Sequence, residues 1–135
     1  MLPYPRLITA PASARDAEAL REVGRRAARD IGASPWGWCA EPLRREAWLW
    51  DGGVGAVMFV RDDPLGPWDV WAVWLAPELR RRGLLTAAWP PFEARYGPFR
   101  VRSPSDALAA FLRKRGWTEP GGVWWPGGPV WTPPD

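Results

Sequence analysis

The sequence predicts an α/β fold of the mixed (α+β) kind, with an antiparallel meander, one β-α-β crossover after it and helices on both faces of the sheet. Three observations predict it. Strand-like runs flank an Asp-Gly turn near the middle of the chain, a glycine-containing loop then opens a helix that leads to another strand, and amphipathic helical patterns lie outside this centre. With 135 residues, the chain is expected to form one domain over residues 1–135.

The first third of the chain predicts a strand and a helix. A short apolar run at 7–10 is the expected first strand, and Ser13 is the expected N-cap of a helix over 14–31 that Gly32 ends. The stretch 34–39 is rich in Pro, Gly and Trp, which indicates an irregular connection. A helical turn is expected at 41–46.

The centre predicts a three-stranded antiparallel meander. Runs at 47–50 and 54–60 flank the turn signal Asp51-Gly52-Gly53, and a second turn at 62–67 leads into a third run at 68–76.

The second half predicts the crossover. A helix is expected from about residue 84, then a strand at 99–102, so the third meander strand and 99–102 should be parallel neighbours with a right-handed connection. Pro90 and Pro91 predict a kink or a restart in that helix. Ser105 is expected to cap a helix that runs to residue 115, and the tail 117–131 could add a hairpin.

Composition excludes several kinds of chemistry. The chain has one cysteine, Cys39, and no histidine, so an intramolecular disulfide, a Cys/His zinc site and a His-based triad are excluded, and no metal is expected. No run has the length of a membrane span, so we expect no membrane partner and take the cytoplasm as the simplest location. The net charge of +3 would favour an anionic partner, either a nucleic acid or a polyphosphate.

The run Arg80-Arg81-Arg82-Gly83 stands between the predicted third strand and the helix that follows it. A helix N-terminus presents unpaired N–H groups, and a glycine lets a phosphate approach the backbone closely, so this is a candidate anion site. The alternative is a solvated surface turn. The patterns of P-loop and dinucleotide-binding proteins are absent.

The same run resembles the acetyl-CoA signature of the GNAT superfamily of N-acetyltransferases, Gln/Arg-x-x-Gly-x-Gly/Ala. It reads here as Arg80-x-x-Gly83-x-Leu85, with Leu85 in place of the small residue. A second match, 105–117, keeps the spacing of a GNAT helix and its Gly-aromatic end. In it Ser105 stands where Asn is common, and Leu112 where a Tyr is usual. The resemblance covers 48–117.

The resemblance implies acetyl-CoA as the cofactor. The third strand near 73–75 would offer backbone groups to the pantetheine arm, the amides of 81–86 would bind the pyrophosphate, and the arginines would contact phosphates. The implied cofactor-binding residues are Val73, Trp74, Leu75, Arg80, Arg81, Arg82, Gly83, Leu84, Leu85, Thr86 and Ser105.

The catalytic residues are less well specified. Asp69 is the candidate general base, expected on one face of the strand with Trp71, Val73 and Leu75. The alternative is a solvated carboxylate at the exit of a turn. Because Leu112 replaces the tyrosine, the usual acid for the departing thiolate is missing, and Tyr96, Ser103, Ser105 or water would have to substitute. Most tryptophans are expected in the core, and the candidates for lining the acceptor cleft are Trp36, Trp38, Trp71, Trp124 and Trp125.

Three functions remain open from the sequence. The first is an enzyme that acetylates a primary amine of a small molecule or protein, and the second is an inactive CoA-binding module of the same fold. The third is a basic nucleic-acid-binding domain, which the focus of arginines at one helix N-terminus argues against. The acceptor is not specified, and neither is the oligomeric state, for which a homodimer is one option.

Overall fold

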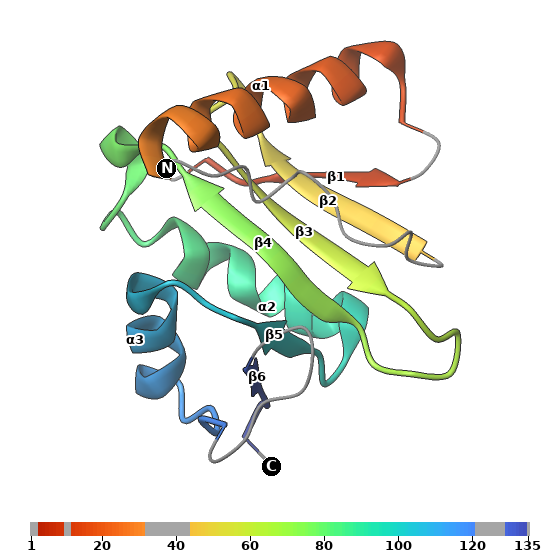
Figure 1. Ribbon diagram of the computed structural model, residues 1–135, viewed down its shortest axis with the longest axis vertical. Helices are drawn as coiled ribbons and strands as arrows, with labels where there is room; N and C mark the ends of the chain where they lie inside the picture. The colour runs from red at the N-terminus through yellow and green to blue at the C-terminus, as the bar shows by residue number, and fades with distance from the viewer. Residues whose placement is uncertain (1–2, 10–11, 32–43, 121–128, 135) are drawn as a thin grey trace.

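The computed structural model describes residues 3–9, 12–31, 44–120 and 129–134 and confirms the predicted fold class (Figure 1). Its elements are, in chain order, β1 (Arg6–Thr9), α1 (Ala14–Ile31), β2 (Arg44–Trp50), β3 (Gly55–Arg61), β4 (Asp69–Leu75), the 3-10 helix η1 (Pro77–Leu79), α2 (Leu84–Tyr96), β5 (Arg100–Arg102), α3 (Asp106–Lys114) and β6 (Val130–Trp131).

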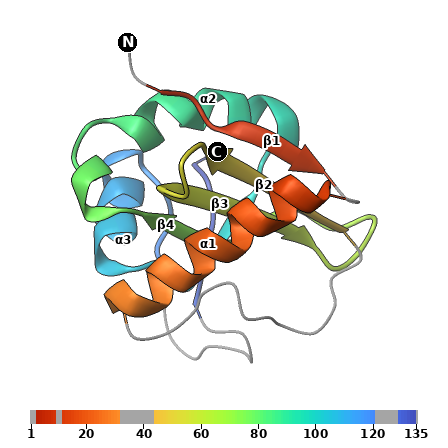
Figure 2. The same cartoon turned by 90° about the horizontal axis from the view of Figure 1, so that it is seen from above.

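The strands form one sheet in the order β1-β2-β3-β4-β5-β6. All neighbours are antiparallel except β4 and β5, which are parallel and are joined through α2. This confirms the predicted meander and crossover. Helix α1 lies along one face of the sheet, and α2 and α3 lie on the other (Figures 1 and 2).

Local signals set most helix ends. The Ser13 hydroxyl accepts a hydrogen bond from the Asp16 amide at 3.1 Å, so the predicted N-cap of α1 is confirmed. Ser105 caps α3 in the same way by accepting from the Leu108 amide at 3.3 Å, and Gly116 follows that helix with a φ of 80°. Side-chain caps within three residues of the helix start are readable from sequence because both partners are local.

One local prediction is wrong, and a second is only partly tested. Strand β2 already begins at Arg44, where a helical turn was expected over 41–46, because 44–46 pair with β3 in the register Arg44↔Arg61. Residues 41–43 lie outside the described part. In the tail, β6 pairs with β5, and the described tail residues form only one internal bridge, Thr118↔Thr132. Residues 121–128 are not described, so most of the expected hairpin stays a prediction.

Helix α2 runs through Pro90 and Pro91 as one helix, so the predicted restart does not occur. Both prolines are exposed, and water can therefore bond the carbonyls that lose their N–H partners. Ala88, Trp89 and Phe92 around them are buried, and this packing holds the helix together where local propensity opposes it.

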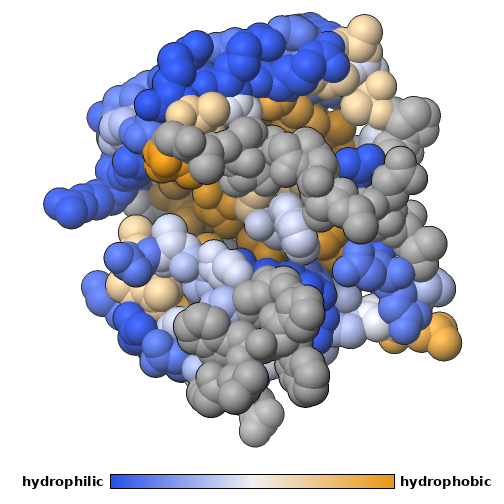
Figure 3. Space-filling view, in the orientation of Figure 1, coloured by the Kyte–Doolittle hydropathy of each residue, from blue (hydrophilic) through white to orange (hydrophobic). Residues whose placement is uncertain are grey.

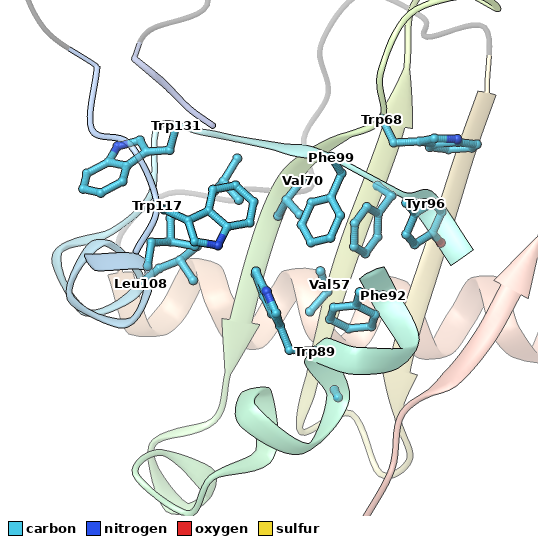
Figure 4. Close-up of a cluster of buried hydrophobic side chains, with 14 of the residues drawn as sticks. Val57, Trp68, Val70, Trp89, Phe92, Tyr96, Phe99, Leu108, Trp117 and Trp131 are labelled. Carbon is cyan, nitrogen blue, oxygen red and sulfur yellow. The ribbon is translucent and has the colours of Figure 1, made fainter. Parts of the chain in front are cut away.

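The sheet separates two cores. The core on the α2 side is aromatic, and Trp89 and Phe92 of α2 lie in it (Figure 4). Phe92 makes edge contacts with Phe59 and Trp48, and Trp89 packs edge-on to Phe111. The core on the α1 side is built from smaller side chains, among them Val23 and Ala27 of α1. The buried tryptophans confirm that most of the described ones serve packing; they are Trp50, Trp68, Trp74, Trp89, Trp117 and Trp131.

The outer face of α1 is polar along its length, as Figure 3 shows at the top of the molecule. Glu18 and Glu22 each pair there with Arg25. Below α1, the same view shows a recessed apolar surface above the lower half of the molecule. Among the described residues, no helix is long and apolar enough to cross a membrane.

Candidate functional site

Strands β4 and β5 pair over only two residues, at Asp69↔Arg100 and Val70↔Val101. β5 ends at Arg102, while β4 continues to Leu75 with its other edge paired to β3 at every residue except Trp71. One edge of β4 therefore leaves its partner strand after Val70. Three of the expected cofactor-binding residues lie on this segment, Val73, Trp74 and Leu75.

A β-bulge sits at the point where the strands separate. The register with β3 pairs Phe59 with Val70 and Met58 with Ala72, which leaves Trp71 as the extra residue. Bulges redirect side chains and interrupt pairing, and they are common beside active sites. This is a feature that the sequence analysis missed, because nothing in the alternation of β4 marks it.

Because of the bulge, the side chains that share a face of β4 with Asp69 differ from those expected. Trp71 packs against the α1-side core, whereas Val73 and Leu75 pack against the α2-side core. Asp69, between the α2-side residues Trp68 and Val70, points to the α1 side. Asp69 thus shares a face with Trp71 but not with Val73 and Leu75. The expectation of strict alternation was wrong because one inserted residue reverses every side chain after it.

The arginine–glycine loop forms an open helix N-terminus. After η1, Arg81 and Gly83 both adopt left-handed conformations, with φ of 63° and 75°, and α2 begins at Leu84. No side chain of the described residues caps this end, so the first amides of α2 have no side-chain acceptor among them. A left-handed non-glycine residue is uncommon and is retained where surrounding structure or function requires it. Thr86 on the first turn is exposed.

The three arginines of the loop differ in their partners. Arg80 donates from Nε to the Leu75 carbonyl at 2.9 Å and pairs through Nη2 with Asp30 of α1. No ion pair joins Arg81 or Arg82 to a carboxylate among the described residues, and both side chains are exposed. A phosphate contact from Arg80 stays a prediction, and the two arginines available to an anion are Arg81 and Arg82.

Asp30 is a residue that the sequence analysis did not single out. Its carboxylate accepts from Arg80 and from Trp74 Nε1 at 3.0 Å, and these two hydrogen bonds lower the pKa of Asp30. The contacts tie the last turn of α1 to the end of β4 and to the arginine loop. No local pattern could have revealed them, since Asp30 and Arg80 are separated by 50 residues.

Asp69, the candidate base, is 2% exposed and lies in an ionic cluster. Its two oxygens accept from Arg100 Nε at 2.8 Å, Arg100 Nη2 at 3.1 Å and Arg102 Nε at 2.8 Å. The carboxylate is therefore buried, and both of its oxygens are engaged by guanidinium groups. A role as general base stays a prediction that this geometry weighs against.

Of the side chains considered for protonating the thiolate, Tyr96 and Ser105 are buried or already hydrogen-bonded, and the residue at the usual tyrosine position is apolar. Leu112 is fully buried in the α2-side core and supplies no acid. Tyr96 lies in the same core near β2, where its hydroxyl accepts from Trp48 Nε1 at 2.8 Å and burial raises the pKa of its phenol. Ser105 Oγ is engaged as the α3 cap. Leu85, at the small position of the signature, packs partly buried against the α2-side core.

The aromatic acceptor cleft is only partly described. Trp71 stands on the α1 face beside the ionic cluster, with the Arg102 guanidinium 5.9 Å from its ring centroid. The other expected cleft residues lie outside the described part of the chain, namely Trp36, Trp38, Trp124 and Trp125. Within the described ranges, no group of three His, Cys, Asp or Glu residues could hold a metal ion.

Comparison with known proteins gives likenesses of structure. The fold is similar to that of Tetrahymena GCN5, with a TM-score of 0.68, 14% sequence identity and coverage of 96% of this chain and 94% of that chain. It is also similar to the catalytic domain of the Tetrahymena GCN5 histone acetyltransferase in complex with coenzyme A. The TM-score is 0.60 and the sequence identity 13%, with coverage of 98% of this chain and 92% of that chain. A third similar structure is an acetyltransferase from Thermus thermophilus, with a TM-score of 0.59, 18% sequence identity and coverage of 97% of each chain.

No family model matches the sequence, and no curated protein matches it either. The likeness is therefore one of backbone arrangement, and it extends over nearly the whole chain and nearly the whole of each neighbour. Together with the meander, the crossover and the early separation of β4 from β5, it shows that this chain has the GNAT fold.

Proposed function

We propose that the protein is an acetyl-CoA-dependent N-acetyltransferase that moves an acetyl group to a primary amine of a small molecule or protein. The observation that carries the proposal is the uncapped N-terminus of α2, preceded by left-handed Arg81 and Gly83 and placed at the end of the free edge of β4. The coenzyme A complex of a structural neighbour, at 13% identity, supports the same type of cofactor.

The loop supplies the groups that a pyrophosphate needs. Amides from Arg81 to Thr86 would donate to the phosphate oxygens, and the positive end of the α2 dipole would favour their charge. Arg81 and Arg82 would add charge-assisted contacts at the rim. From there the pantetheine arm would follow β4 from Leu75 toward the bulge, with backbone groups of the free edge as partners.

Acetyl transfer itself requires little from the chain. The lone pair of a neutral amine attacks the thioester carbonyl carbon, the C–S bond breaks, and the thiolate takes up a proton as the nitrogen releases one. Because Asp69 is held by two arginines and Leu112 is apolar, water would carry both protons. The protein would then contribute the placement of the two reactants.

Calorimetry with acetyl-CoA tests the proposal, with paired glycine variants. Gly83→Ala forces a Cβ onto a left-handed residue in the loop and should weaken binding about tenfold. Gly97→Ala is the control: Gly97 also has positive φ, 64°, but follows the far end of α2, where nothing lies within 4 Å of the added Cβ. It should leave the affinity unchanged. No binding to the unmodified protein at micromolar concentration would refute the proposal.

A second candidate is a CoA-binding module without activity. The buried Leu112 and the ion-paired Asp69 favour it, since the two expected proton carriers are missing or occupied. Release of free thiol in the presence of an amine panel separates the two: binding without thiol release assigns the module. The cytoplasmic location and the oligomeric state stay predictions.

A nucleic-acid-binding role finds less support. Many arginines already pair with carboxylates, which leaves no continuous unpaired stripe among the described residues. Six of them lie on β1, α1, α3 and the loop after β4, and they are Arg6, Arg21, Arg25, Arg26, Arg80 and Arg113.

A further inference from the structure

The ionic cluster on the α1 face contains two cations for one buried anion. Asp69 is shared by Arg100 and Arg102, which come from alternate positions of β5 and so project to the same face. The arginine side chains remain 34% and 20% exposed, while that of Asp69 is 2% exposed. The only other carboxylate paired with the cluster in the described chain is Asp62. Its Oδ2 lies 3.8 Å from Arg102 Nη2, and the Asp62 side chain is 58% exposed.

Within the described chain, the hydrogen bonds leave donors of the cluster unused. Asp69 engages Nε and Nη2 of Arg100 and Nε of Arg102. The 3.8 Å separation from Asp62 is too long for a hydrogen bond, so the terminal nitrogens of Arg102 bond no other side chain of the described residues. A guanidinium held from one side by a buried carboxylate is fixed in place, and a fixed fork suits a second oxyanion.

The cluster lies at the reacting end of the proposed cofactor path. β4 and β5 separate immediately after Val70, and Trp71 of the bulge stands under Arg102. From Leu75 to Asp69 the strand spans about 20 Å, at about 3.3 Å per residue. An extended arm that starts at the arginine loop and follows β4 therefore brings its thioester end toward the cluster. Arg45 of β2 lies in the same row of the sheet, across Val60 from Asp69.

The charge of this end selects among amines. A basic acceptor, such as a lysine-rich tail or a polyamine, would bring positive charge toward two fixed guanidiniums and be repelled. An acceptor that carries an anion near its amine would satisfy the unused donors and place its nitrogen beside the thioester. The same field disfavours the protonated form of that amine, which reduces the need for a base.

We propose that Arg100 and Arg102 form an anion subsite that selects acceptors bearing a carboxylate or phosphate a few bonds from the primary amine. This inference rests on the proposed acetyltransferase function. It assigns Asp69 the role of a positioning residue that fixes the two guanidiniums.

The test uses four small primary amines of similar length with the unmodified protein and acetyl-CoA. Besides the primary amine, β-alanine carries a carboxylate, phosphoethanolamine carries a phosphate, β-alanine amide carries no further charged group, and ethylenediamine carries a second amine. Thiol release should give a kcat/KM at least about tenfold higher for one of the anionic amines than for the amide, and lowest for ethylenediamine. The two anionic amines distinguish carboxylate from phosphate recognition. Equal or higher values for the amide and the diamine would overturn the inference.

A variant pair locates the selectivity. Arg102→Gln removes one guanidinium and leaves Asp69 bonded twice by Arg100, so folding should be retained. It should lower kcat/KM for the favoured anionic amine about tenfold, through KM, and so reduce the preference for that amine over the amide. Arg113→Gln is the matched control, because Arg113 also pairs with a carboxylate, Glu119, and also covers a tryptophan, Trp131, but lies on α3. An equal loss in both variants would contradict the subsite.

The two proposals fail in different ways. If acetyl-CoA does not bind, the acetyltransferase function fails, and calorimetry of the four amines with the unloaded protein still decides the subsite. If acetyl-CoA binds but no thiol is released, the same calorimetry on the CoA complex decides it. Binding of an anionic amine that is lost in Arg102→Gln supports the subsite, and the absence of any such preference refutes it.

Discussion

The two ends of β4 differ in how far the protein satisfies its own polar groups. At the Leu75 end, the amides of α2 lack a side-chain cap and Arg81 and Arg82 have no ion pair in the described chain. At the Asp69 end, the carboxylate accepts three hydrogen bonds and is buried. Among the described residues, the first end leaves backbone amides and two arginines without a partner of this kind, whereas at the second end a buried carboxylate holds two guanidiniums in place.

The largest effect that would test this difference is the loss of the Asp69 charge. Asp69→Asn leaves two guanidiniums without their shared anion and turns an amide N–H₂ toward them, so unfolding free energy should fall by about 2 to 4 kcal/mol. Urea denaturation measures it, with Glu119→Gln as the exposed counterpart that should change little. If Asp69 instead acts as a base, Asp69→Asn would alter the pH–rate profile while stability stays close to that of the unmodified protein.

The Leu112→Tyr substitution tests whether a tyrosine at this position can protonate the departing thiolate. Leu112 is fully buried, so a larger side chain with a hydroxyl has no room and should cost about 1 to 3 kcal/mol of stability. Thiol release should not increase. A gain in kcat at unchanged stability would show that the reacting end is less closed than its packing indicates.

Arg82→Ala acts on the open end. Because Arg82 has no ion pair in the described chain, its removal should not change the melting temperature but should weaken acetyl-CoA binding about tenfold, the loss of one charge-assisted contact. Calorimetry and thermal unfolding measured together separate the two. A drop in melting temperature with unchanged affinity would mean that Arg82 serves the fold.

Glu46, the second buried carboxylate, gives a reference away from both ends. Arg95 bonds both of its oxygens, at 2.7 and 2.8 Å, and lowers the pKa of Glu46. A lowered folded-state pKa adds stability above the unfolded value and loses it on acidification, so stability should decline as the pH falls below about 4.5. The decline should be shallower in Glu46→Gln, measured by denaturation at several pH values. An identical slope would argue that other carboxylates dominate.

Of these substitutions, Asp30→Asn should have the smallest effect, which is a modest loss of acetyl-CoA affinity. It weakens the tie between α1 and the arginine loop but keeps acceptors for Arg80 and Trp74, so acetyl-CoA affinity should fall by about two- to fivefold. A change as large as that of Arg82→Ala would mean that the loop conformation depends on α1.

Much of the fold could be predicted because its signals are local. The Asp51-Gly52-Gly53 turn, the Ser13 and Ser105 caps and the glycine after the arginine run depend on neighbours a few residues away, and they fix the meander, the crossover and the position of the loop. Strand β2 extended further than predicted because its first residues are held by β3 and not by their own propensity.

The sequence by itself determined that an arginine–glycine loop would open a helix after a strand, because that arrangement follows from residues adjacent in the chain. Only the tertiary structure decided the roles of the charges. Arg80 is drawn to Asp30, 50 residues earlier, and Asp69 to Arg100 and Arg102, more than 30 residues later. One bulge at Trp71 also decided which side chains share a face with Asp69. Ion pairs and registers join distant segments, so their outcome depends on how the strands meet.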